Sequence, residues 1–319
     1  MMERIGFIGL GNVGGKLAGS LLRNGFDLTV RDLKQEIARP FLDNGAKWAE
    51  SPKELAETVE LIITCLPNPA ASATVMEAEN GVLAGISPGK IWAEMSTTDE
   101  EEVKRLGAKV KAIGGEVLDC PVSGGCHRAA TGNISIFVGG ERSSFEKILP
   151  VMKVLGRRIL HTGKLGSASV LKVLTNYLAT ANLVTLCEAL TTAKKAGMDL
   201  STTYEAIRIS SGNSFVHETE SQVILNGSRD INFTMDLVLK DISLFQAIAD
   251  RAGVHLEVSP LLIDIFKDGE KRYGSREWSP NIVRRLEEAC DTQVLASGFP
   301  AEMVDNETEV SGAEVKVRR

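Results

Sequence analysis

The chain has 319 residues, which is enough for one large domain or two medium ones. Hydrophobic residues make up 43% of it and charged residues 24%, values that are ordinary for a globular protein and argue against a disordered chain. The net charge is −6 and the sequence has no long basic stripe, so nucleic acid is not an expected partner.

Cysteine usage and the N-terminal residues point to a reducing compartment. The five cysteines form no C-x-x-C pair and no disulfide-rich spacing. An early acidic residue and interspersed glycines are unlike a signal peptide. Cys126 and His127 lack a third or fourth ligand at suitable spacing, so no metal site is expected. We therefore predict a cytoplasmic protein with reduced thiols.

The first half of the chain alternates strand and helix patterns. Strands are predicted at 4–9, 26–32, 59–67, 90–96, 115–122, 134–140 and 157–163, with helices at 12–24, 51–57 and 97–114. Two helices open with predicted capping boxes, Ser51 with Glu54 and Thr98 with Glu101. This alternation predicts an α/β fold: an N-terminal Rossmann domain, with a doubly wound parallel sheet covered on both faces.

After residue 163 the strand patterns almost vanish. Helices are predicted at 166–196, 201–209, 234–252, 259–271 and 280–290. We therefore expect a dinucleotide-binding domain at 1–164 and an all-helical domain at 165–296, with roles in substrate binding and oligomerisation. The tail at 297–319 has little apolar periodicity and is predicted to be extended or disordered.

Between Leu165 and Cys187 the only charged residue is Lys172. The stretch is long enough to span a bilayer, but its Ser, Thr and Asn residues and its lysine favour a buried helix of a soluble protein. We expect no membrane partner.

A G-x-G-x-x-G pattern lies between the first predicted strand and the first predicted helix. The turn comprises Gly9, Leu10, Gly11, Asn12, Val13 and Gly14. Its glycines suit a tight turn, close approach to a pyrophosphate and close helix packing, and the helix N-terminus attracts the phosphates. Asp32 ends the second strand, where a carboxylate can hold the adenine-ribose hydroxyls. The sequence predicts a nicotinamide dinucleotide as cofactor.

Asp32 favours NAD over NADP, because its carboxylate would repel a 2′-phosphate. Leu33 follows, where an NADP-binding protein would often carry arginine. Arg31 and Lys34 could instead turn towards a 2′-phosphate, so NADP stays open.

Four motifs together resemble the β-hydroxyacid dehydrogenase family, which includes 3-hydroxyisobutyrate dehydrogenase and tartronate semialdehyde reductase. They are "GFIGLGNVG" at 6–14, "DCPVSGG" at 119–125, "GSASVLKVLTN" at 166–176 and "LKDISLFQAIA" at 239–249. The resemblance covers about residues 3–290, in the family's order. It implies homodimers or homotetramers and a small hydroxy-acid or semialdehyde substrate.

The resemblance also implies roles for individual residues. Ser123, Gly124 and Gly125 would hold the substrate's acid group. Lys172 and Asn176, four residues apart on one helix face, would be the catalytic pair. Lys240 would lie near cofactor and substrate. Further cofactor contacts map onto Leu66, Pro67, Ser96 and Thr97, and substrate-pocket positions onto Phe215 and His217.

Lys172 would take the hydroxyl proton while hydride leaves for the nicotinamide, and would return it in the reverse reaction. A free lysine has a pKa of about 10.4, which burial and the positive nicotinamide would lower. Asn176 would orient the lysine or the hydroxyl. A snorkelling lysine is the alternative for Lys172, and a solvated helix ion pair is the alternative for Lys240 with Asp241.

The sequence departs from the family after "SGG", where "CHRAATG" replaces small residues. Arg128 could recognise a more acidic or larger substrate, such as a dicarboxylate or a sulfonate. A surface turn with His127 and Arg128 facing water is slightly favoured.

The leading prediction is an NAD-dependent oxidoreductase of small 3-hydroxy acids, or of the corresponding semialdehydes. Alternatives are an NADPH-dependent reductase of semialdehydes or sulfonated aldehydes, an imine reductase and a non-catalytic NAD-binding sensor. Lys172 argues against an imine reductase, which generally lacks that lysine. The intact Lys172–Asn176 pair argues against a sensor.

Overall fold

The computed structural model describes residues 2–317 and divides the chain into two compact units. The first comprises Met1–Lys172 and Asp305–Arg319, and the second Val173–Val304. The division lies at Lys172 rather than at the predicted residue 164, because the start of helix α8 (Ser167–Lys195) is hydrogen-bonded to a sheet strand of the first unit. The end of the tail joins the first unit instead of forming a separate arm.

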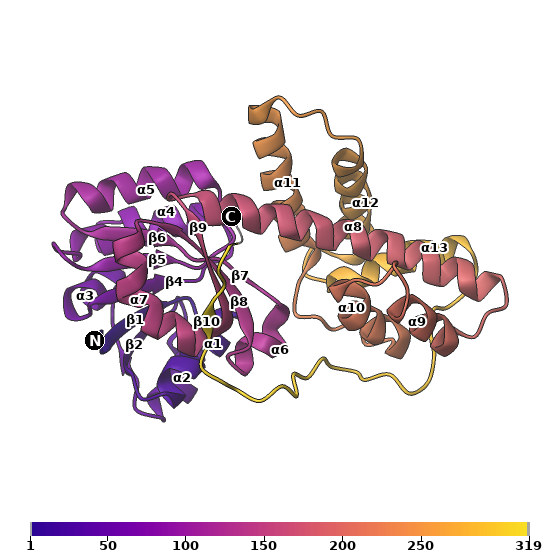
Figure 1. Cartoon of the computed structure of the whole chain (residues 1–319), viewed down its shortest axis with the longest axis horizontal. Helices are drawn as coiled ribbons and strands as arrows, with labels where there is room; N and C mark the ends of the chain where they lie inside the picture. Colours follow the sequence, from indigo (N-terminus) through magenta and orange to yellow (C-terminus); the bar gives the residue numbers. More distant parts are fainter. Residues whose placement is uncertain (1, 318–319) are drawn as a thin grey trace. The chain divides into compact units, whose positions relative to one another are not determined.

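The first unit is built on one mixed sheet (Figure 1), with strand order β10-β9-β8-β6-β5-β4-β1-β2-β3 and β7 paired with β8. The strands are β1 (Arg4–Ile8), β2 (Asp27–Arg31), β3 (Lys47–Trp48), β4 (Leu61–Thr64), β5 (Ile91–Glu94), β6 (Glu116–Asp119), β7 (Val122–Ser123), β8 (Ile134–Gly140), β9 (Gly156–Gly163) and β10 (Ala313–Glu314). The predicted Rossmann architecture is confirmed.

The sequence analysis predicted a parallel sheet, but the sheet is mixed. Strand β8 runs antiparallel to both β6 and β7. The single strand predicted at 115–122 is divided into β6 and β7 on either side of Pro121, which has no N–H to continue a ladder. The division is important for the site, because it ends β6 at Asp119 and begins a second, short strand that carries Ser123.

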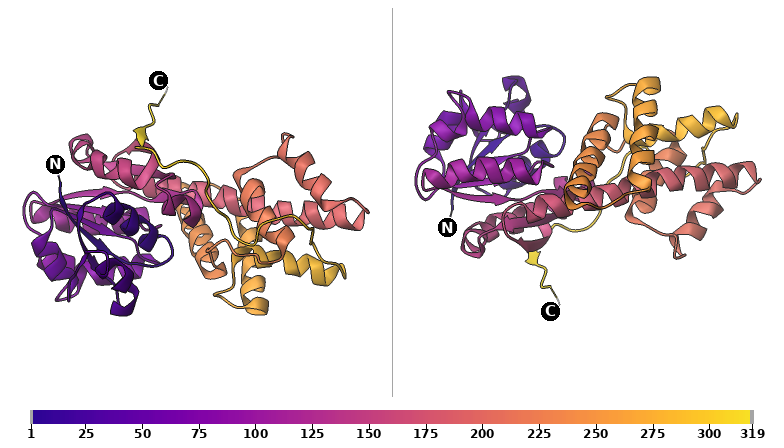
Figure 2. Two further views of the ribbon diagram at one scale, coloured as in Figure 1. Left: turned by 90° about the horizontal axis from the view of Figure 1, so that it is seen from below. Right: turned by 90° about the horizontal axis from the view of Figure 1, so that it is seen from above.

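Helices cover both faces of the sheet (Figures 1 and 2). They are α1 (Gly14–Arg23), α2 (Gln35–Leu42), α3 (Pro52–Thr58), α4 (Pro69–Glu77), the 3₁₀ turn η1 (Val82–Ala84), α5 (Glu100–Ala112), α6 (Gly125–Ala130) and α7 (Arg142–Leu155). Side chains alternate between two cores: Phe7 and Ile63 pack with α1 and α7, whereas Ile62 and Trp92 pack with α3 and α5. Burial on both faces explains why β4 reads as a continuous apolar run.

One predicted helix cap is confirmed and the other is wrong. The Ser51 hydroxyl accepts a hydrogen bond from the Glu54 amide at 3.1 Å, and the Glu54 carboxylate accepts one from the amide of Glu50. In α5 the cap is Asp99 and not Thr98: its carboxylate accepts from the Glu101 amide at 2.7 Å. A carboxylate beside the positive helix end is the stronger cap.

The second unit is helical around its own core. After α8 it contains α9 (Leu200–Arg208), α10 (Phe215–Asn226), α11 (Met235–Ala252), α12 (Val258–Tyr273), the 3₁₀ turn η2 (Ser279–Val283) and α13 (Arg284–Ala289). The sequence analysis did not predict α10. Seven of its twelve residues are buried, so it lacks the one-sided apolar stripe by which a surface helix is recognised.

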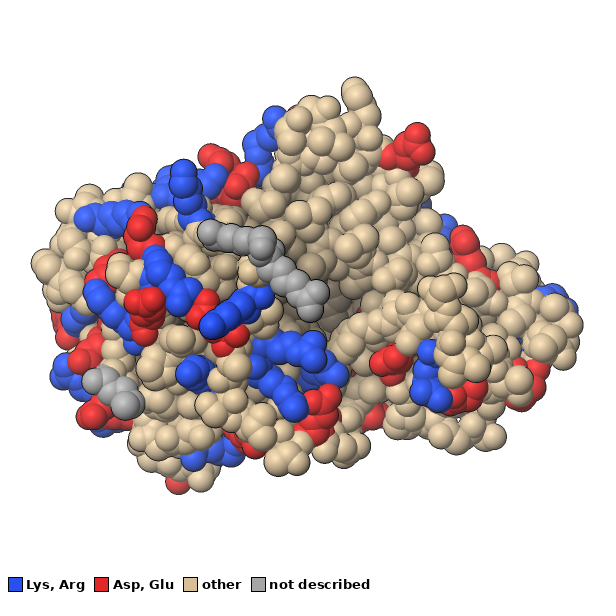
Figure 3. Space-filling view, viewed as in Figure 1, with Lys and Arg blue, Asp and Glu red and all other residues tan. Residues whose placement is uncertain are grey.

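By length and composition, α8 could cross a membrane, but a core helix of a soluble protein meets the same criteria. On the face seen in Figure 3, Lys and Arg side chains are intermixed with Asp and Glu over the first unit. The surface ion pairs of the first unit include Arg105 with Glu77 at 2.7 Å.

Glu220 on α10 is half-buried, and its carboxyl group makes the stability of the protein depend on pH. One of its oxygens is buried without a hydrogen-bond partner, and burial raises the pKa of Glu220 to about 8. Between about pH 4.5 and pH 8, unfolding therefore releases a proton from this group, and stability falls as the pH rises.

We predict that Glu220→Gln stabilises the protein at neutral pH by removing this buried ionisable group. The gain in unfolding free energy should be near zero below pH 4.5 and grow by at most about 1.4 kcal/mol per pH unit up to pH 8. Denaturant titrations at several pH values measure it. Glu218→Gln, an exposed change on the same helix, is the control. A gain independent of pH would contradict this account.

Candidate active site

The glycine turn between β1 and α1 is shaped by close backbone contacts. Gly9 has a φ of +98°, and a Cβ there would lie 2.3 Å from the carbonyl oxygen of Cys65. A Cβ on Gly14 would lie 2.0 Å from the carbonyl oxygen of Gly9. Gly11 differs, since a Cβ there would meet nothing within 4 Å. The fold itself requires Gly9 and Gly14, whereas the open space at Gly11 fits a ligand that approaches the backbone.

Asp32 lies beside this turn, at the end of β2. Its carboxylate accepts a hydrogen bond from the Leu10 amide at 2.7 Å, and the Gly9 amide donates to the Arg31 carbonyl at 2.9 Å. The next side chain, Leu33, is 94% exposed. The glycine turn and the Asp32 carboxylate therefore lie beside each other at the end of the sheet, as the predicted dinucleotide site requires.

A hydrogen-bonded network links the ends of β4 and β5, where Leu66, Pro67, Ser96 and Thr97 are located. The Ser96 hydroxyl accepts from the Leu66 amide at 2.7 Å and donates to the Glu94 carboxylate. Glu94 is buried, which raises its pKa, and it also accepts from the Ser96 amide at 2.9 Å. The sequence analysis missed Glu94, because the apolar run 90–96 identifies a buried strand without showing which polar side chain it holds.

The predicted acid-binding motif, Ser123 to Gly125, occupies β7 and the start of α6. Ser123 pairs with Ser135 of β8, and Gly124 and Gly125 have φ values of +129° and +84°. Two successive residues at positive φ strongly favour glycine at both positions. The segment that follows is a short helix and not the predicted surface turn: Cys126 is buried, and His127 and Arg128 are half-buried.

His127 and Arg128 lie close to these glycines. A Cβ on Gly125 would lie 2.8 Å from the His127 ring, and one on Gly124 would lie 3.4 Å from Cδ of Arg128. Burial lowers the pKa of His127, and the Arg128 charge lowers it further. Arg128 is thus the cation that borders the motif.

Asp119 connects this motif to the helix that carries Lys172. Its carboxylate accepts hydrogen bonds from the amides of Gly166 and Ser169, at 2.9 and 2.7 Å, and from the Ser169 hydroxyl at 2.9 Å. Burial raises the pKa of Asp119 although these hydrogen bonds act against it. Asp119 therefore caps α8 from the end of β6. Lys172 lies one turn further along α8 and is 8% exposed.

In the second unit, Asn176 and Lys240 are joined through Asp241. The Asn176 side-chain amide donates to one carboxylate oxygen of Asp241, and the Lys240 ammonium lies 2.9 Å from the other. The Asp241 side chain is 2% exposed and that of Lys240 19%. The pair is therefore not the solvated helix pair considered as the alternative. The sequence analysis did not identify Asp241 as a site residue.

The two predicted pocket residues on α10 differ in environment. His217 is 1% exposed, its Nε2 lies 2.9 Å from the Tyr204 carbonyl oxygen, and its ring packs on that of Tyr204. Burial lowers the pKa of His217. These contacts fit a role in the core, so we do not carry His217 into the proposal below. Phe215 is 44% exposed and stays a prediction.

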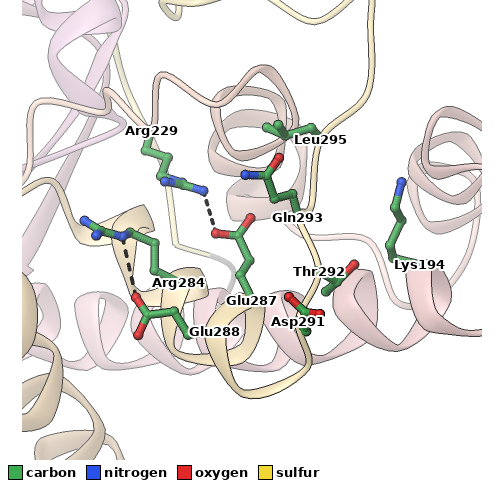
Figure 4. Close-up of a pocket in the computed structure, with 9 residues that line it drawn as sticks. All are labelled: Lys194, Arg229, Arg284, Glu287, Glu288, Asp291, Thr292, Gln293 and Leu295. Atoms are coloured by element: carbon green, nitrogen blue, oxygen red, sulfur yellow. Dashed lines mark hydrogen bonds and ion pairs between the residues drawn. The ribbon is translucent and has the colours of Figure 1, made fainter.

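A polar hollow of about 690 Å³ lies elsewhere in the second unit (Figure 4). It contains none of the predicted site residues, and its charges pair with each other: Arg229 with Glu287 at 2.6 Å and Arg284 with Glu288 at 4.0 Å. We do not assign it a ligand. Within residues 2–317, no group of three or more His, Cys, Asp or Glu side chains could hold a metal ion.

Two family models match the chain, one for each half. The model described as the NAD binding domain of 6-phosphogluconate dehydrogenase matches residues 4–163. The model described as the NAD-binding domain of NADP-dependent 3-hydroxyisobutyrate dehydrogenase matches residues 166–286.

Relatives with named activities match over most of the length. A 2-(hydroxymethyl)glutarate dehydrogenase of Eubacterium barkeri is 33% identical, covering 91% of this chain and 97% of its own. The mitochondrial 3-hydroxyisobutyrate dehydrogenase of Rattus norvegicus is 30% identical, covering 86% and 84%. A crystal structure of 3-hydroxyisobutyrate dehydrogenase from Salmonella typhimurium is 26% identical with a TM-score of 0.80, covering 88% and 98%.

The glycine turn yields a matched pair of predictions. Gly11→Ala should leave the melting temperature nearly unchanged, since its Cβ meets no protein atom, but weaken NAD binding about tenfold or more by intruding on the pyrophosphate. Gly14→Ala should destabilise the fold by about 1–3 kcal/mol, since its Cβ collides with backbone. Calorimetry and thermal melts test both. Unchanged NAD affinity in Gly11→Ala would contradict the assigned site.

Proposed function

Because the chain belongs to the β-hydroxyacid dehydrogenase family, we propose that it oxidises a small 3-hydroxy acid, or reduces the corresponding semialdehyde. The observation that carries this is a buried lysine, Lys172, on a helix whose start is hydrogen-bonded to Asp119, four residues before Ser123. Burying one lysine in an otherwise apolar stretch is costly, and a catalytic role supplies a reason for it.

The cofactor is a nicotinamide dinucleotide, which supplies the hydride chemistry when bound. The glycine turn and the N-terminus of α1 hold its pyrophosphate, and Asp32 holds the adenine-ribose hydroxyls. We propose NAD rather than NADP, because a 2′-phosphate would have to approach the carboxylate of Asp32.

The chain's own residues bind the substrate and move a proton. The Ser123 hydroxyl and the amides of Gly124 and Gly125 hold the acid group. Lys172, as a neutral amine, accepts the hydroxyl proton during oxidation and returns it in the reverse reaction. Asn176 donates to the substrate hydroxyl or orients the lysine. Asp241 holds both Asn176 and Lys240 within the second unit.

A second candidate is a dicarboxylic 3-hydroxy acid. The Arg128 stem lies beside Gly124, and its guanidinium, now 3.5 Å from the Glu307 carboxylate, would turn to a second carboxylate of the substrate. The relative named for 2-(hydroxymethyl)glutarate, a dicarboxylate, gives independent support. Arg128→Ala would then raise KM for a dicarboxylate far more than for a monocarboxylate.

We further propose a cytoplasmic homodimer or homotetramer that binds neither nucleic acid nor membranes. The five cysteines are free thiols in the structure, which fits a reducing compartment. Leu171, Leu174 and Leu178 leave an exposed apolar strip along α8 that suits a subunit interface.

The test is a panel of 3-hydroxyisobutyrate, serine, glycerate, 3-hydroxypropionate, threonate, 2-(hydroxymethyl)glutarate and sulfonated analogues, each with NAD⁺ and with NADP⁺. We expect turnover of at least one hydroxy acid, faster with NAD⁺. Lys172→Ala should lower kcat about 10²–10⁴-fold with unchanged NAD affinity. Lys164→Ala, at an exposed lysine before the same helix, is the control.

Three outcomes would contradict the proposal. Near wild-type turnover in Lys172→Ala would remove the lysine from the mechanism. Tight NAD binding without turnover of any hydroxy acid or semialdehyde would favour a non-catalytic sensor, and turnover of imines alone would favour an imine reductase.

A further inference from the structure

The end of the C-terminal tail belongs to the first unit and pairs with its sheet (Figure 1). Strand β10 extends the sheet in parallel beside β9, and the Val315 amide donates to the Ile159 carbonyl at 2.7 Å. The Gly312 amide donates to the Lys153 carbonyl at 2.8 Å, and a Cβ on Gly312 would lie 1.9 Å from the Gly156 carbonyl oxygen. This anchoring contradicts a disordered tail.

Upstream of β10, Asp305 binds the turn between α6 and β8. Its carboxylate accepts hydrogen bonds from the Thr131 hydroxyl and, at 2.7 Å, from the side-chain amide of Asn133. That same amide group lies 3.0 Å from the Glu307 carbonyl oxygen. Asn133 is 4% exposed and Asp305 is half-buried, so the two bonds to the Asp305 carboxylate are partly buried bonds to a charged acceptor.

Surface ion pairs add to this attachment. The Glu307 carboxylate lies 2.5 Å from the guanidinium of Arg157 and 3.5 Å from that of Arg128, and Glu309 lies 3.5 Å from Arg23. Exposed pairs of this kind contribute little individually. Asp305 is therefore the residue on which the attachment of the tail to this turn mainly depends.

The turn that Asp305 binds connects two elements that shape the acid-binding motif. Thr131 is the C-terminal cap residue of α6, and this helix begins at Gly125. The strand that follows, β8, places Ser135 opposite Ser123 in the sheet. A shift of the turn would thus reach the motif both along α6 and through the β7–β8 ladder.

We propose that Asp305 is a positioning residue for the substrate's acid group, so that the C-terminal tail is a working part of the active site. The family model that matches the second unit ends at residue 286, so the tail lies outside what it describes. The inference rests on the proposed function in one respect only, namely that Ser123–Gly125 binds the substrate.

Hydrogen exchange of the full-length chain tests the positioning without any assay of activity. In Asp305→Ala, the amides of residues 123–133 should exchange at least about tenfold faster than in the wild type. Glu314→Gln is the matched control: it also breaks a tail ion pair, with Arg142 at 2.5 Å, but at β10. It should leave exchange at 123–133 unchanged.

Steady-state kinetics tests the consequence for substrate. Asp305→Ala should raise KM for the hydroxy acid about tenfold, because a shift of Ser123–Gly125 weakens binding of the acid group. KM for NAD should stay within about twofold of the wild-type value. Thr131→Val, which removes one donor, should give a smaller shift in the same direction and serves if Asp305→Ala folds poorly. Asp305→Asn, which keeps one acceptor oxygen, should restore part of the wild-type KM.

The two measurements separate the possible failures. Unchanged exchange at 123–133 in Asp305→Ala, or equal effects of Asp305→Ala and Glu314→Gln on KM, would overturn the positioning role. Faster exchange at 123–133 in a protein that turns over no hydroxy acid would uphold the positioning and refute the proposed function.

Discussion

The carboxylate of Asp119 is the interaction on which the proposed site depends most. It lies at the end of β6, four residues before Ser123, and accepts three hydrogen bonds from the first turn of α8. One buried charge thereby fixes the strand that leads to the acid-binding motif relative to the helix that carries Lys172. A carboxylate buried at a helix N-terminus is stabilised by the amides and the helix dipole, which offset much of its desolvation.

The same arrangement recurs in the first unit. Buried or partly buried carboxylates accept hydrogen bonds from backbone amides and hydroxyl groups, mostly at the ends of strands. Asp32 holds the glycine turn through the Leu10 amide, and Glu94 holds Ser96 and, through it, Leu66. Asp305 extends the pattern from the C-terminal tail to the turn after α6. The ends of these strands are thus held by hydrogen-bonded carboxyl groups, which supplies part of the pre-organisation that binding and proton transfer require.

The sequence predicted the Rossmann and helical halves, because buried strands and amphipathic helices have distinct periods. It also predicted the cofactor turn, where backbone geometry itself requires glycine. It did not reveal Asp119, Glu94 or Asp241, since an acidic residue next to a strand or lysine looks the same whether solvated or buried. The antiparallel β8 and the pairing of β10 with β9 depend on contacts between residues far apart in sequence, which local patterns do not encode.

The most direct test of the central claim, that the amine of Lys172 moves the proton, is chemical rescue of the Lys172→Ala variant. Small primary amines added to this variant with NAD⁺ and the best substrate should restore part of its turnover, because the cavity left by the side chain admits a free base. The restored rate should rise with the concentration of neutral amine and be absent in the wild type. Normal NAD binding with no rescue by any amine would contradict the claim.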